Sequence, residues 1–331
     1  MLKKISPAIL CMILWAAWIE AATAENLRPN EGLRFEFASV EEGRDILGTR
    51  DEFVQQMSPF DRKVRLQSET DLGGQELLKL AAEQVLEWED TEKRILSRAI
   101  DEIQPELIKL GVRWNQPIKL IKTTGREESN AAYTRAQAIV FPRQKIGSEE
   151  KPPARLLAHE LFHVISRSEI QLRDRLYRLI GFHPAGVIRL PESLRESQLT
   201  NPDAPKMEHV IRLNTEEGKS IFVTPYLFAS RAYSQKDTSL FSYLNFQLLE
   251  VVESETGLWE PIFKDDRPSL ISPRHPDYHR QIRDNTTYII HPEEIIADNF
   301  AMMIVRAKVK DSDLIDKIKR EIQSAYVQNE K

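Results

Sequence analysis

A short histidine motif inside an apolar stretch constrains this 331-residue chain more than any other feature. His159 and His163 flank Glu160-Leu161-Phe162, and most of the residues around them from 154 to 165 are apolar. Residues four apart lie on one face of a helix, so both imidazoles can reach one tetrahedral metal ion while Glu160 approaches water at that ion. An ordinary amphipathic helix could carry the same spacing, but a helix that is apolar on nearly every side is buried, and buried histidines need partners. The segment therefore predicts a buried helix that supplies two zinc ligands and a general base.

A third ligand has to come from elsewhere, and the best source is the acidic segment that begins at Pro292. Glu294 and Asp298 are four apart, so on a helix one carboxylate can bind the ion while the other holds the second ring nitrogen of a histidine. Glu293 is a weaker candidate, because an alanine stands four positions after it. His291 and Asp298 stay open as alternative ligands. The same segment is also typical of a plain helix start, with proline at the first position and acids near the positive end of the dipole.

The two segments together, HExxH followed by ExxxD, resemble the pattern of the gluzincin zinc metallopeptidases. Two more stretches resemble neprilysin-type enzymes of that group. Residues 130–133 read Asn-Ala-Ala-Tyr and residues 139–142 read Ile-Val-Phe-Pro, while residues 294–299 match their Glu-x-x-Ala-Asp-Asn. These segments cover about a tenth of the chain and stand in the same order as in that family.

The resemblance implies a zincin-like α+β fold, with a small mixed or antiparallel sheet beside the active-site helix. It implies a catalytic Zn²⁺ bound by His159, His163 and Glu294, with Asp298 hydrogen-bonded behind a histidine. It also implies that Asn130 and Ala131 lie on the sheet edge that pairs with the backbone of a peptide substrate. The expected reaction is peptide hydrolysis, with Glu160 as the general base.

The chain also departs from the neprilysin pattern. The segment 164–293, between His163 and Glu294, is far longer than in that family, so an insertion over about 182–290 must form a lid, a wall or a small subdomain. The segment 299–331, after Asp298, contains no histidine, so the histidine that stabilises the transition state in that family is absent there. These departures indicate a distant or separate gluzincin-like family.

Another residue would then have to stabilise the developing oxyanion. The candidates are tyrosines and histidines of the insertion, of which Tyr288 lies closest in sequence to Glu294. We name Tyr288 and Tyr226 as catalytic candidates and keep His209, Tyr278 and His279 open.

The hydrophobic pattern predicts helices, then a sheet, then further helices. The expected helices cover 75–88, 91–110 with a kink or break at Pro105, 152–180 with a possible break after Ser166, 292–308 and 312–327. Residues 118–122 are predicted as a strand with 132–141 as its antiparallel partner. Three strand-like runs in the insertion, at 208–213, 220–230 and 240–252, predict a meander.

The N-terminus has the pattern of an export signal. Lys3 and Lys4 precede an apolar run from 8 to 18, and Ala22-Thr23-Ala24 fits a cleavage site for signal peptidase. The run is shorter than the about 20 residues that span a bilayer, so no permanent membrane anchor is expected. We therefore divide the chain into a signal peptide (1–24), a polar N-terminal arm (25–74) and a catalytic domain (75–331), and we expect a periplasmic or secreted protein.

Composition narrows the function further. The formal net charge is −5, and the sequence has neither a basic stripe nor a glycine-rich phosphate loop, so nucleic acid and nucleotides are poor candidates for partners. The sequence predicts an exported zinc metallopeptidase that acts on peptides or proteins. The alternatives are a zinc amidase that cleaves a non-protein amide and a degenerate binding module held together by zinc. Glu160 counts against the last, because a structural site needs no base.

Overall fold

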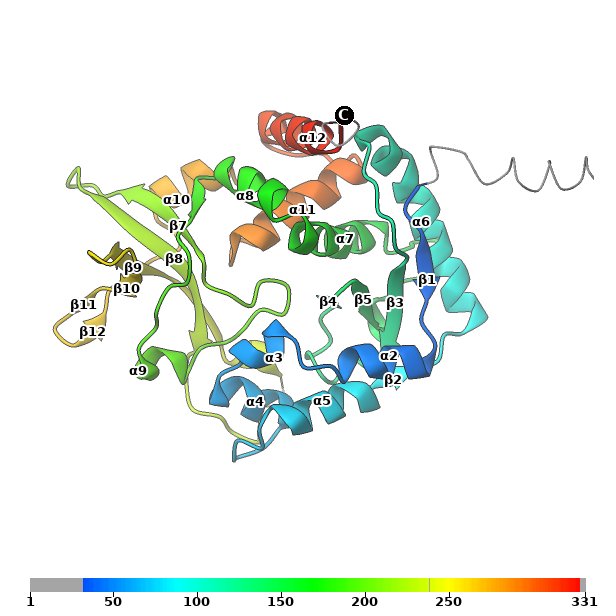
Figure 1. Ribbon diagram of the computed structural model, residues 1–331, viewed down its shortest axis with the longest axis horizontal. Coiled ribbons are helices and arrows are strands. Elements are labelled where there is room, and N and C mark those ends of the chain that lie inside the picture. The colour runs from blue at the N-terminus through cyan, green and yellow to red at the C-terminus, as the bar shows by residue number, and fades with distance from the viewer. Residues whose placement is uncertain (1–31, 238, 328–331) are drawn as a thin grey trace, which may run out of the picture. The chain divides into compact units, whose positions relative to one another are not determined.

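The computed structural model describes residues 32–237 and 239–327, and a five-stranded sheet lies beside the helix that carries the histidine motif (Figure 1). Its strands follow the order β1 (Phe35–Phe37), β3 (Ile118–Thr123), β5 (Ala138–Pro142) and β4 (Tyr133–Arg135), and β2 (Val85–Leu86) also pairs with β3. β1 and β5 run parallel to β3, whereas β2 and β4 are antiparallel to their partners. The edge strand β4 is therefore antiparallel to its neighbour and faces the motif helix.

The prediction of one strand over 132–141, antiparallel to 118–122, is wrong. The segment is a hairpin of β4 and β5, and β5 runs parallel to β3. The chain reverses at Ala136, which has a φ of 50°. Two-residue hairpin turns usually carry glycine or asparagine at such positions, and neither residue is present here. The turn therefore had no recognisable signal in the sequence.

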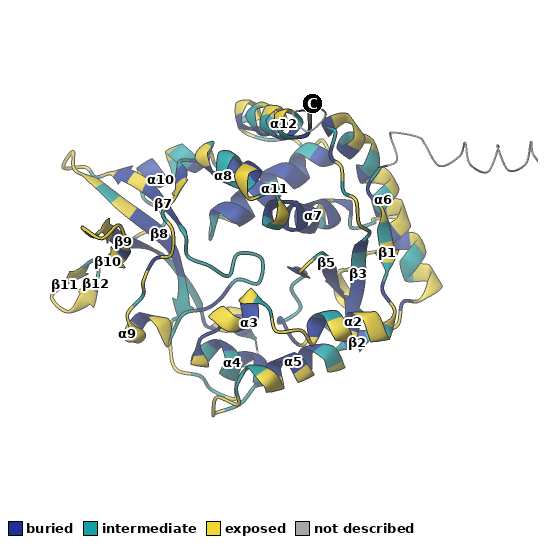
Figure 2. Cartoon of the chain, in the orientation of Figure 1, coloured by how far each residue is buried: buried dark blue, intermediate teal, exposed yellow. Residues whose placement is uncertain are grey.

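Helices cover the other side of the motif helix α7 (Ala154–Ser168). α6 (Asp90–Leu110), α8 (Ile170–Arg178) and α11 (Pro292–Ile304) contact α7, and α12 (Ser312–Val327) packs on these three helices. Leu157 and Leu161 of α7 join Ile139 of the sheet and Phe300 of α11 in the largest apolar core. Figure 2 shows α7 and α11 buried along most of their lengths, so the motif lies at the centre of the core.

The helix limits differ from the prediction in detail. The motif helix stops at Ser168 and a new helix starts at Ile170, while α11 ends at Ile304. α6 continues through Pro105 without a break, and Gly111 ends it with a φ of 74°. Left-handed glycine is a common helix end, so this stop was readable from the sequence. The helix expected over 75–88 is shorter, because α5 (Gly74–Glu83) gives way to β2.

The insertion forms an antiparallel meander, as the sequence predicted. Consecutive strands pair in the order β6 (Phe182–Pro184), β7 (His209–Asn214), β8 (Ser220–Ala229), β9 (Leu244–Glu253) and β10 (Trp259–Pro261), with β13 (Leu270–Ile271) also on β9. Smaller elements are η1 (Arg143–Lys145), α9 (Glu192–Arg195), η2 (Leu240–Ser242), α10 (Pro276–Ile282) and the hairpin of β11 (Phe263–Lys264) with β12 (Arg267–Pro268).

The polar arm expected over 25–74 is not extended in its described part. Residues 33–73 contain β1 and three helices, α2 (Val40–Leu47), α3 (Glu52–Gln56) and α4 (Pro59–Leu66), and they belong to the same compact unit as the rest of the described chain. Each of these helices is only five to eight residues long, so the pattern that would identify it covers at most about two turns. Side chains of Ser39, Asp51 and Ser58 cap them. The predicted signal peptide (1–24) lies outside the described residues.

The observed class is α+β, as predicted. Among the described residues, no helix combines the length and hydropathy that a bilayer span requires.

Candidate metal centre

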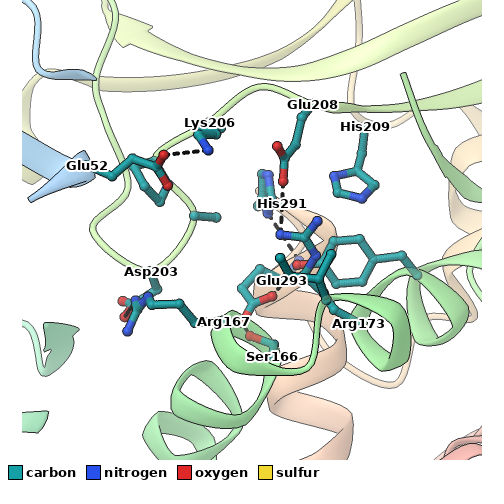
Figure 3. A pocket seen from close by; sticks show the side chains of 14 residues that line it. Glu52, Ser166, Arg167, Arg173, Asp203, Lys206, Glu208, His209, His291 and Glu293 are labelled. Carbon is teal, nitrogen blue, oxygen red and sulfur yellow. Dashed lines mark hydrogen bonds and ion pairs between the residues drawn. The ribbon is translucent and has the colours of Figure 1, made fainter. Parts of the chain in front are cut away.

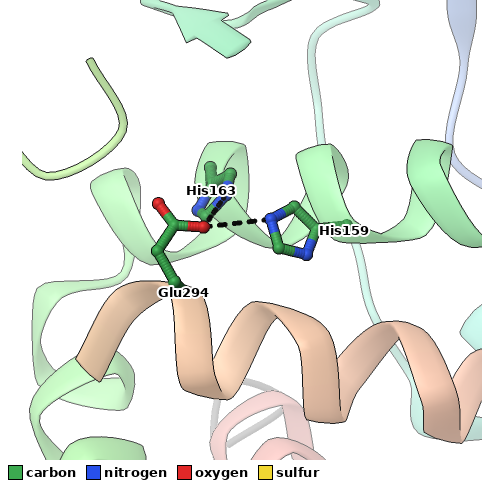
Figure 4. A group of neighbouring side chains, drawn as sticks. All are labelled: His159, His163 and Glu294. Carbon is green, nitrogen blue, oxygen red and sulfur yellow. Dashed lines mark hydrogen bonds and ion pairs between the residues drawn. The ribbon is translucent and has the colours of Figure 1, made fainter. Parts of the chain in front are cut away.

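Three predicted ligands meet between α7 and α11 (Figure 4). The Nε2 atom of His159 lies 3.1 Å from Oε2 of Glu294, and Nε2 of His163 lies 3.6 Å from the same oxygen. A tetrahedral zinc site with bonds of about 2.0–2.1 Å separates its ligand atoms by about 3.3 Å. The two distances to the Glu294 oxygen are close to this spacing, the ligand atoms of the group all lie within 4.8 Å of one another, and all three side chains are buried.

Each histidine is held from behind by its own carboxylate. Nδ1 of His159 lies 3.3 Å from Oδ1 of Asp298, and Nδ1 of His163 lies 2.7 Å from Oε1 of Glu293. Such bonds fix the ring and the tautomer, and they leave Nε2 available for a metal ion. Glu293, considered from the sequence only as a weak ligand candidate, lies behind His163 instead.

The two supporting carboxylates have partners of their own. Glu293 accepts hydrogen bonds from the hydroxyls of Ser166 and Tyr177. Asp298 accepts a hydrogen bond from Thr286 and lies 3.3 Å from Nη2 of Arg155. Both supports are therefore built into the packing around α11.

A loop of the insertion, residues 200–205, crosses the site and is called the site loop below. Asn201 donates a hydrogen bond of 2.6 Å to Oε1 of Glu294, which turns the other oxygen toward the histidines. Oδ1 of Asp203 accepts hydrogen bonds from the backbone nitrogen and the hydroxyl of Thr134, at 2.8 and 2.6 Å. Asp203 also forms a second possible metal-binding group with Glu160 and His163. Sequence reasoning missed both loop residues, because the loop has no periodicity and belongs to no motif.

The centre is strongly acidic. Burial, followed by the negative charge of Asp203, raises the pKa of Glu160 to about 8. Burial opposes the charging of both histidines, but the surrounding carboxylates still raise the pKa of His163 to about 9. Burial likewise opposes the charging of Glu294, yet His163 and His159 lower its pKa to about 2. The arrangement is therefore one that attracts a cation.

A cavity of about 470 Å³ opens onto this centre. His159, Glu160, Glu294 and Asp298 line it, together with Tyr288. The Tyr288 ring stacks near the His159 ring, with centroids 6.1 Å apart and an angle of 25° between planes. Ligand cavities typically measure about 300–1,000 Å³, so this one has room for a substrate segment.

The structure does not bring Tyr226 to the site, so its position contradicts the predicted catalytic role. The Tyr226 hydroxyl donates to the carbonyl oxygen of Leu194 at 2.7 Å. Its ring stacks on Phe228, within an apolar cluster that also contains Trp259. Tyr226 is therefore part of the apolar core of the meander.

The other oxyanion candidates also lie apart from the cavity. Tyr278 donates to the carbonyl oxygen of Ile289, His279 lies 2.6 Å from Asp284, and His209 lies 3.1 Å from Asp174. Of the five candidates, all within the described part of the chain, only Tyr288 lines the cavity.

His291, the alternative ligand, caps α11. Its Nδ1 accepts a hydrogen bond from the backbone nitrogen of Glu293 at 3.1 Å, and burial lowers its pKa to about 4. Figure 3 shows His291 on the wall of a separate cavity of about 210 Å³, together with His209 and Glu293. Two of the cations there are paired, Arg173 with Glu208 and Lys206 with Glu52. His291 belongs to neither of the two possible metal-binding groups that the described residues form.

Of the two predicted substrate-binding residues, Ala131 lies at the main cavity and Asn130 does not. Ala131 lines the main cavity, two residues before β4 begins. Asn130 has a φ of 68°, and its backbone nitrogen donates to the carbonyl oxygen of Gly125. Its side-chain oxygen is buried, has no hydrogen-bond partner among the described residues and lies against Gly125. Asn130 does not line the cavity.

The fold and site define an α+β protein with a cluster of metal-ligand side chains between two buried helices. Comparison with protein families shows one match, in which residues 122–171 fit the eCIS core domain, a domain associated with extracellular contractile injection systems. The matched segment contains β4, β5 and the motif helix, so it includes His159, Glu160 and His163. No curated protein and no solved structure matches the chain.

Proposed function

We propose that the protein is an exported zinc metallopeptidase of zincin-like fold. The observation that carries the proposal is the convergence of two Nε2 atoms on one oxygen of Glu294, at the spacing of a zinc site. His159 and His163 are each fixed by a separate carboxylate, an arrangement common among histidines that bind metals. The third ligand comes from α11, a helix far along the chain from the motif helix.

Two buried atoms without partners support the fit to zinc. Nε2 of His163 and Oε2 of Glu160 are both inaccessible, and neither has a hydrogen-bond partner among the residues that the structure describes. Buried polar atoms are rarely left unsatisfied, and such groups often mark a function. A metal ion would satisfy His163, and a water molecule at the site would satisfy Glu160.

The roles of the chain's own residues follow from their positions. Zinc in such a site acts as a Lewis acid toward water and toward a carbonyl group. Glu160 would take the proton from the attacking water and pass it to the leaving nitrogen. Tyr288 would donate a hydrogen bond to the developing oxyanion, since its side chain lines the same cavity. Asn201 would keep the Glu294 carboxylate oriented.

The zincin-like fold is supported by the edge strand. β4 lies beside α7 and is antiparallel to the other strand of its hairpin, and its outer side carries the Thr134 amide that Asp203 now occupies. An edge strand can pair with an extended peptide, but β4 is buried and Asp203 holds this amide, so the site loop would have to move before a peptide could pair there. Export is supported by the leader-like pattern of the segment 1–24.

The test combines metal analysis with hydrolysis. The purified protein should contain about one zinc per chain and should cleave casein or a general fluorescent peptide only without chelator. Glu160→Gln should keep the zinc and lose turnover, because the amide preserves shape but is not a base. His163→Ala should lose the zinc. Full metal content in His163→Ala, or full turnover in Glu160→Gln, would overturn the proposal.

A further inference from the structure

The site loop is attached to the edge strand at the place where a peptide backbone would pair. Oδ1 of Asp203 accepts hydrogen bonds from the backbone nitrogen and the hydroxyl of Thr134, at 2.8 and 2.6 Å. The same hydroxyl accepts a hydrogen bond of 2.7 Å from Arg167 of α7, whose guanidinium lies 3.9 Å from Asp203. The Thr134 amide is therefore already paired, with a side chain of the loop and not with another strand.

The Asp203 carboxylate also lies close to the metal centre. One of its atoms is within 4.8 Å of a ligand atom of Glu160 and of one of His163. Asp203 is also on the wall of the metal-side cavity. A substrate carbonyl that approaches water at Glu160 would have to enter the same space. The loop therefore obstructs both the pairing position on β4 and the approach to the general base.

The charges around Asp203 only partly favour this position. Arg167 attracts its carboxylate, whereas the carboxylates of Glu160 and Glu294 repel it. Two hydrogen bonds and one cation thus hold the loop on β4 against two negative charges of the site. This balance permits the loop to be released from the strand.

Two prolines favour an extended loop. Pro202 and Pro205 stand on either side of the dipeptide Asp203-Ala204. Proline fixes its own φ and restricts the residue before it to extended backbone, so both Asn201 and Ala204 are restricted in this way. A segment that is already ordered loses less conformational entropy when it occupies a site. The loop is therefore suited to cover the site in the way that a preformed inhibitor does.

The loop is held at its two ends and has space beside its middle. At one end, Asp61 accepts hydrogen bonds from the backbone nitrogen and the hydroxyl of Thr200. Just beyond the other end, Lys206 pairs with Glu52. Between these points, Asp203 borders both the metal-side cavity and the cavity of about 210 Å³ drawn in Figure 3. Packed interiors contain few voids larger than a water molecule, so a segment between two cavities has unusual room to shift.

We propose that the protein is latent, because its site loop is a built-in competitive inhibitor that Asp203 holds at Thr134 and that has to leave β4 before an extended peptide can pair there. The proposal rests on the proposed peptidase function. The apparent affinity of such a protein for a peptide is reduced by the fraction of molecules in which the loop is open. Loss of the Asp203 contacts should therefore tighten peptide binding while the candidate metal ligands stay the same.

Binding of fluorescein-labelled casein tests the inhibition without turnover. In the zinc-loaded Glu160→Gln protein, addition of Asp203→Ala should lower the Kd for casein at least about tenfold by fluorescence anisotropy, because it raises the open fraction. Addition of Asp203→Asn removes the same charge but should lower the Kd much less, since the amide oxygen still accepts from Thr134. Equal gains from the two Asp203 variants would overturn the role of these hydrogen bonds.

A control and a second variant complete the binding experiment. Asp237→Ala is the matched control, because Asp237 is another aspartate of the insertion, pairs with Arg231 and does not line the metal-side cavity. If Asp203→Ala fails to fold, Pro205→Gly replaces it, and its looser loop should move the Kd in the same direction. An unchanged Kd in a folded loop variant, or an equal gain in the control, would overturn the proposal.

Hydrogen exchange shows directly whether a bound peptide displaces the loop. In the Glu160→Gln protein, the backbone nitrogen of Asp203 donates to the Asn201 side chain as long as the loop is closed. Saturation with casein should therefore increase the exchange rate of the segment 199–206 at least about tenfold, because local opening sets the exchange rate of such amides. The amides of β4 should stay protected, because the peptide takes the place of the loop. An unchanged or slower exchange of the segment 199–206 would overturn the proposal.

Turnover separates this inference from the peptidase proposal. Zinc-loaded Asp203→Ala should cleave casein with kcat/KM at least about tenfold above that of the wild-type protein, since kcat/KM depends on the open fraction of the free enzyme. Equal values in the two proteins would overturn the latency and leave the peptidase proposal intact. If neither protein cleaves casein, the peptidase proposal fails, and the binding and exchange results alone decide whether the loop competes with a peptide.

Discussion

Neighbouring carboxylates at the start of α11 hold different parts of the metal centre. Glu294 lies near both Nε2 atoms, whereas Glu293 lies against Nδ1 of His163. Successive residues on a helix point about 100° apart, so adjacent glutamates can approach separate atoms. This allows one short segment to supply both a candidate ligand and a carboxylate that supports a histidine.

The two supporting carboxylates should contribute to zinc affinity by different amounts. Glu293→Gln and Asp298→Asn should each weaken zinc binding by about 10- to 100-fold, because such partners orient the histidine ligands. We expect the larger loss for Glu293→Gln, since its side chain is 2% exposed and that of Asp298 is 17% exposed. Competition with a metal chelator measures the order. Glu208→Gln, at the wall of the other cavity, is the control, and wild-type affinity in both test variants would contradict the assignment.

The two tyrosines predicted as catalytic provide a matched pair. Tyr288→Phe should reduce kcat with zinc content unchanged, because Tyr288 lines the metal-side cavity. Tyr226→Phe should leave kcat unchanged and reduce the free energy of unfolding by about 1 kcal/mol, because its hydroxyl bonds to Leu194. Steady-state kinetics and urea unfolding separate the two effects. A normal kcat in Tyr288→Phe would exclude it as the oxyanion donor.

At this scale, regular spacing decided what could be predicted from the sequence. The residues that meet at the centre share fixed helical intervals, and the structure brings together the predicted set of His159, His163 and Glu294. Asn201 and Asp203 come from a loop whose approach to the site depends on tertiary packing. The spacing of the sequence did not reveal where Tyr226 lies, because an aromatic residue on a strand can belong to a pocket or to a core.

Among the secondary-structure elements, the N-terminal helices hold the site loop in place. Arg65 of α4 is buried and binds Asp61 and Glu128. Asp61 in turn accepts hydrogen bonds from the backbone nitrogen and the hydroxyl of Thr200, at the start of the site loop. The segment expected to be an arm is thus connected to the metal centre through one buried network.

Loss of this network should lower the free energy of unfolding. Arg65→Ala should lower the free energy of unfolding by about 3–5 kcal/mol, because it leaves two buried carboxylates without a cation. Arg62→Ala is the control on the same helix, since the pair of Arg62 with Asp71 is partly exposed and should contribute about 0–1 kcal/mol. Urea unfolding at neutral pH measures both. Similar losses in the two variants would contradict the role assigned to the network.

Element length explains what the sequence revealed at this scale. The long meander strands β8 and β9 were recognised, as were the long helices. The hairpin at Ala136 and the helices α2, α3 and α4 were missed, because their signals extend over only a few residues. Parallel pairing of β5 with β3 is a tertiary choice that the alternating pattern of one strand does not specify.

In the whole molecule, the metal centre joins parts of the chain that are far apart in sequence. α7 and α11 pack against each other in the largest core, and the segment 164–293 separates the candidate ligands that they carry. Between them the chain forms the entire meander and the site loop. A metal ion bound to both helices would therefore stabilise the folded state of this part of the chain, because the unfolded chain offers no comparable site.

Zinc should accordingly raise the unfolding temperature of the metal-free protein. A ligand at about 1,000 times its Kd stabilises the folded state by about 4 kcal/mol, provided that it does not bind the unfolded chain. For domains of roughly 150–250 residues, each kcal/mol shifts the melting temperature by roughly 2–4 °C, so a rise of about 8–16 °C is expected. Glu160→Gln should show the same rise, because Glu160 is a base and not a ligand. His163→Ala should show almost none. Calorimetry with and without zinc measures the shifts, and an equal rise in His163→Ala would place the stabilising ion somewhere other than between α7 and α11.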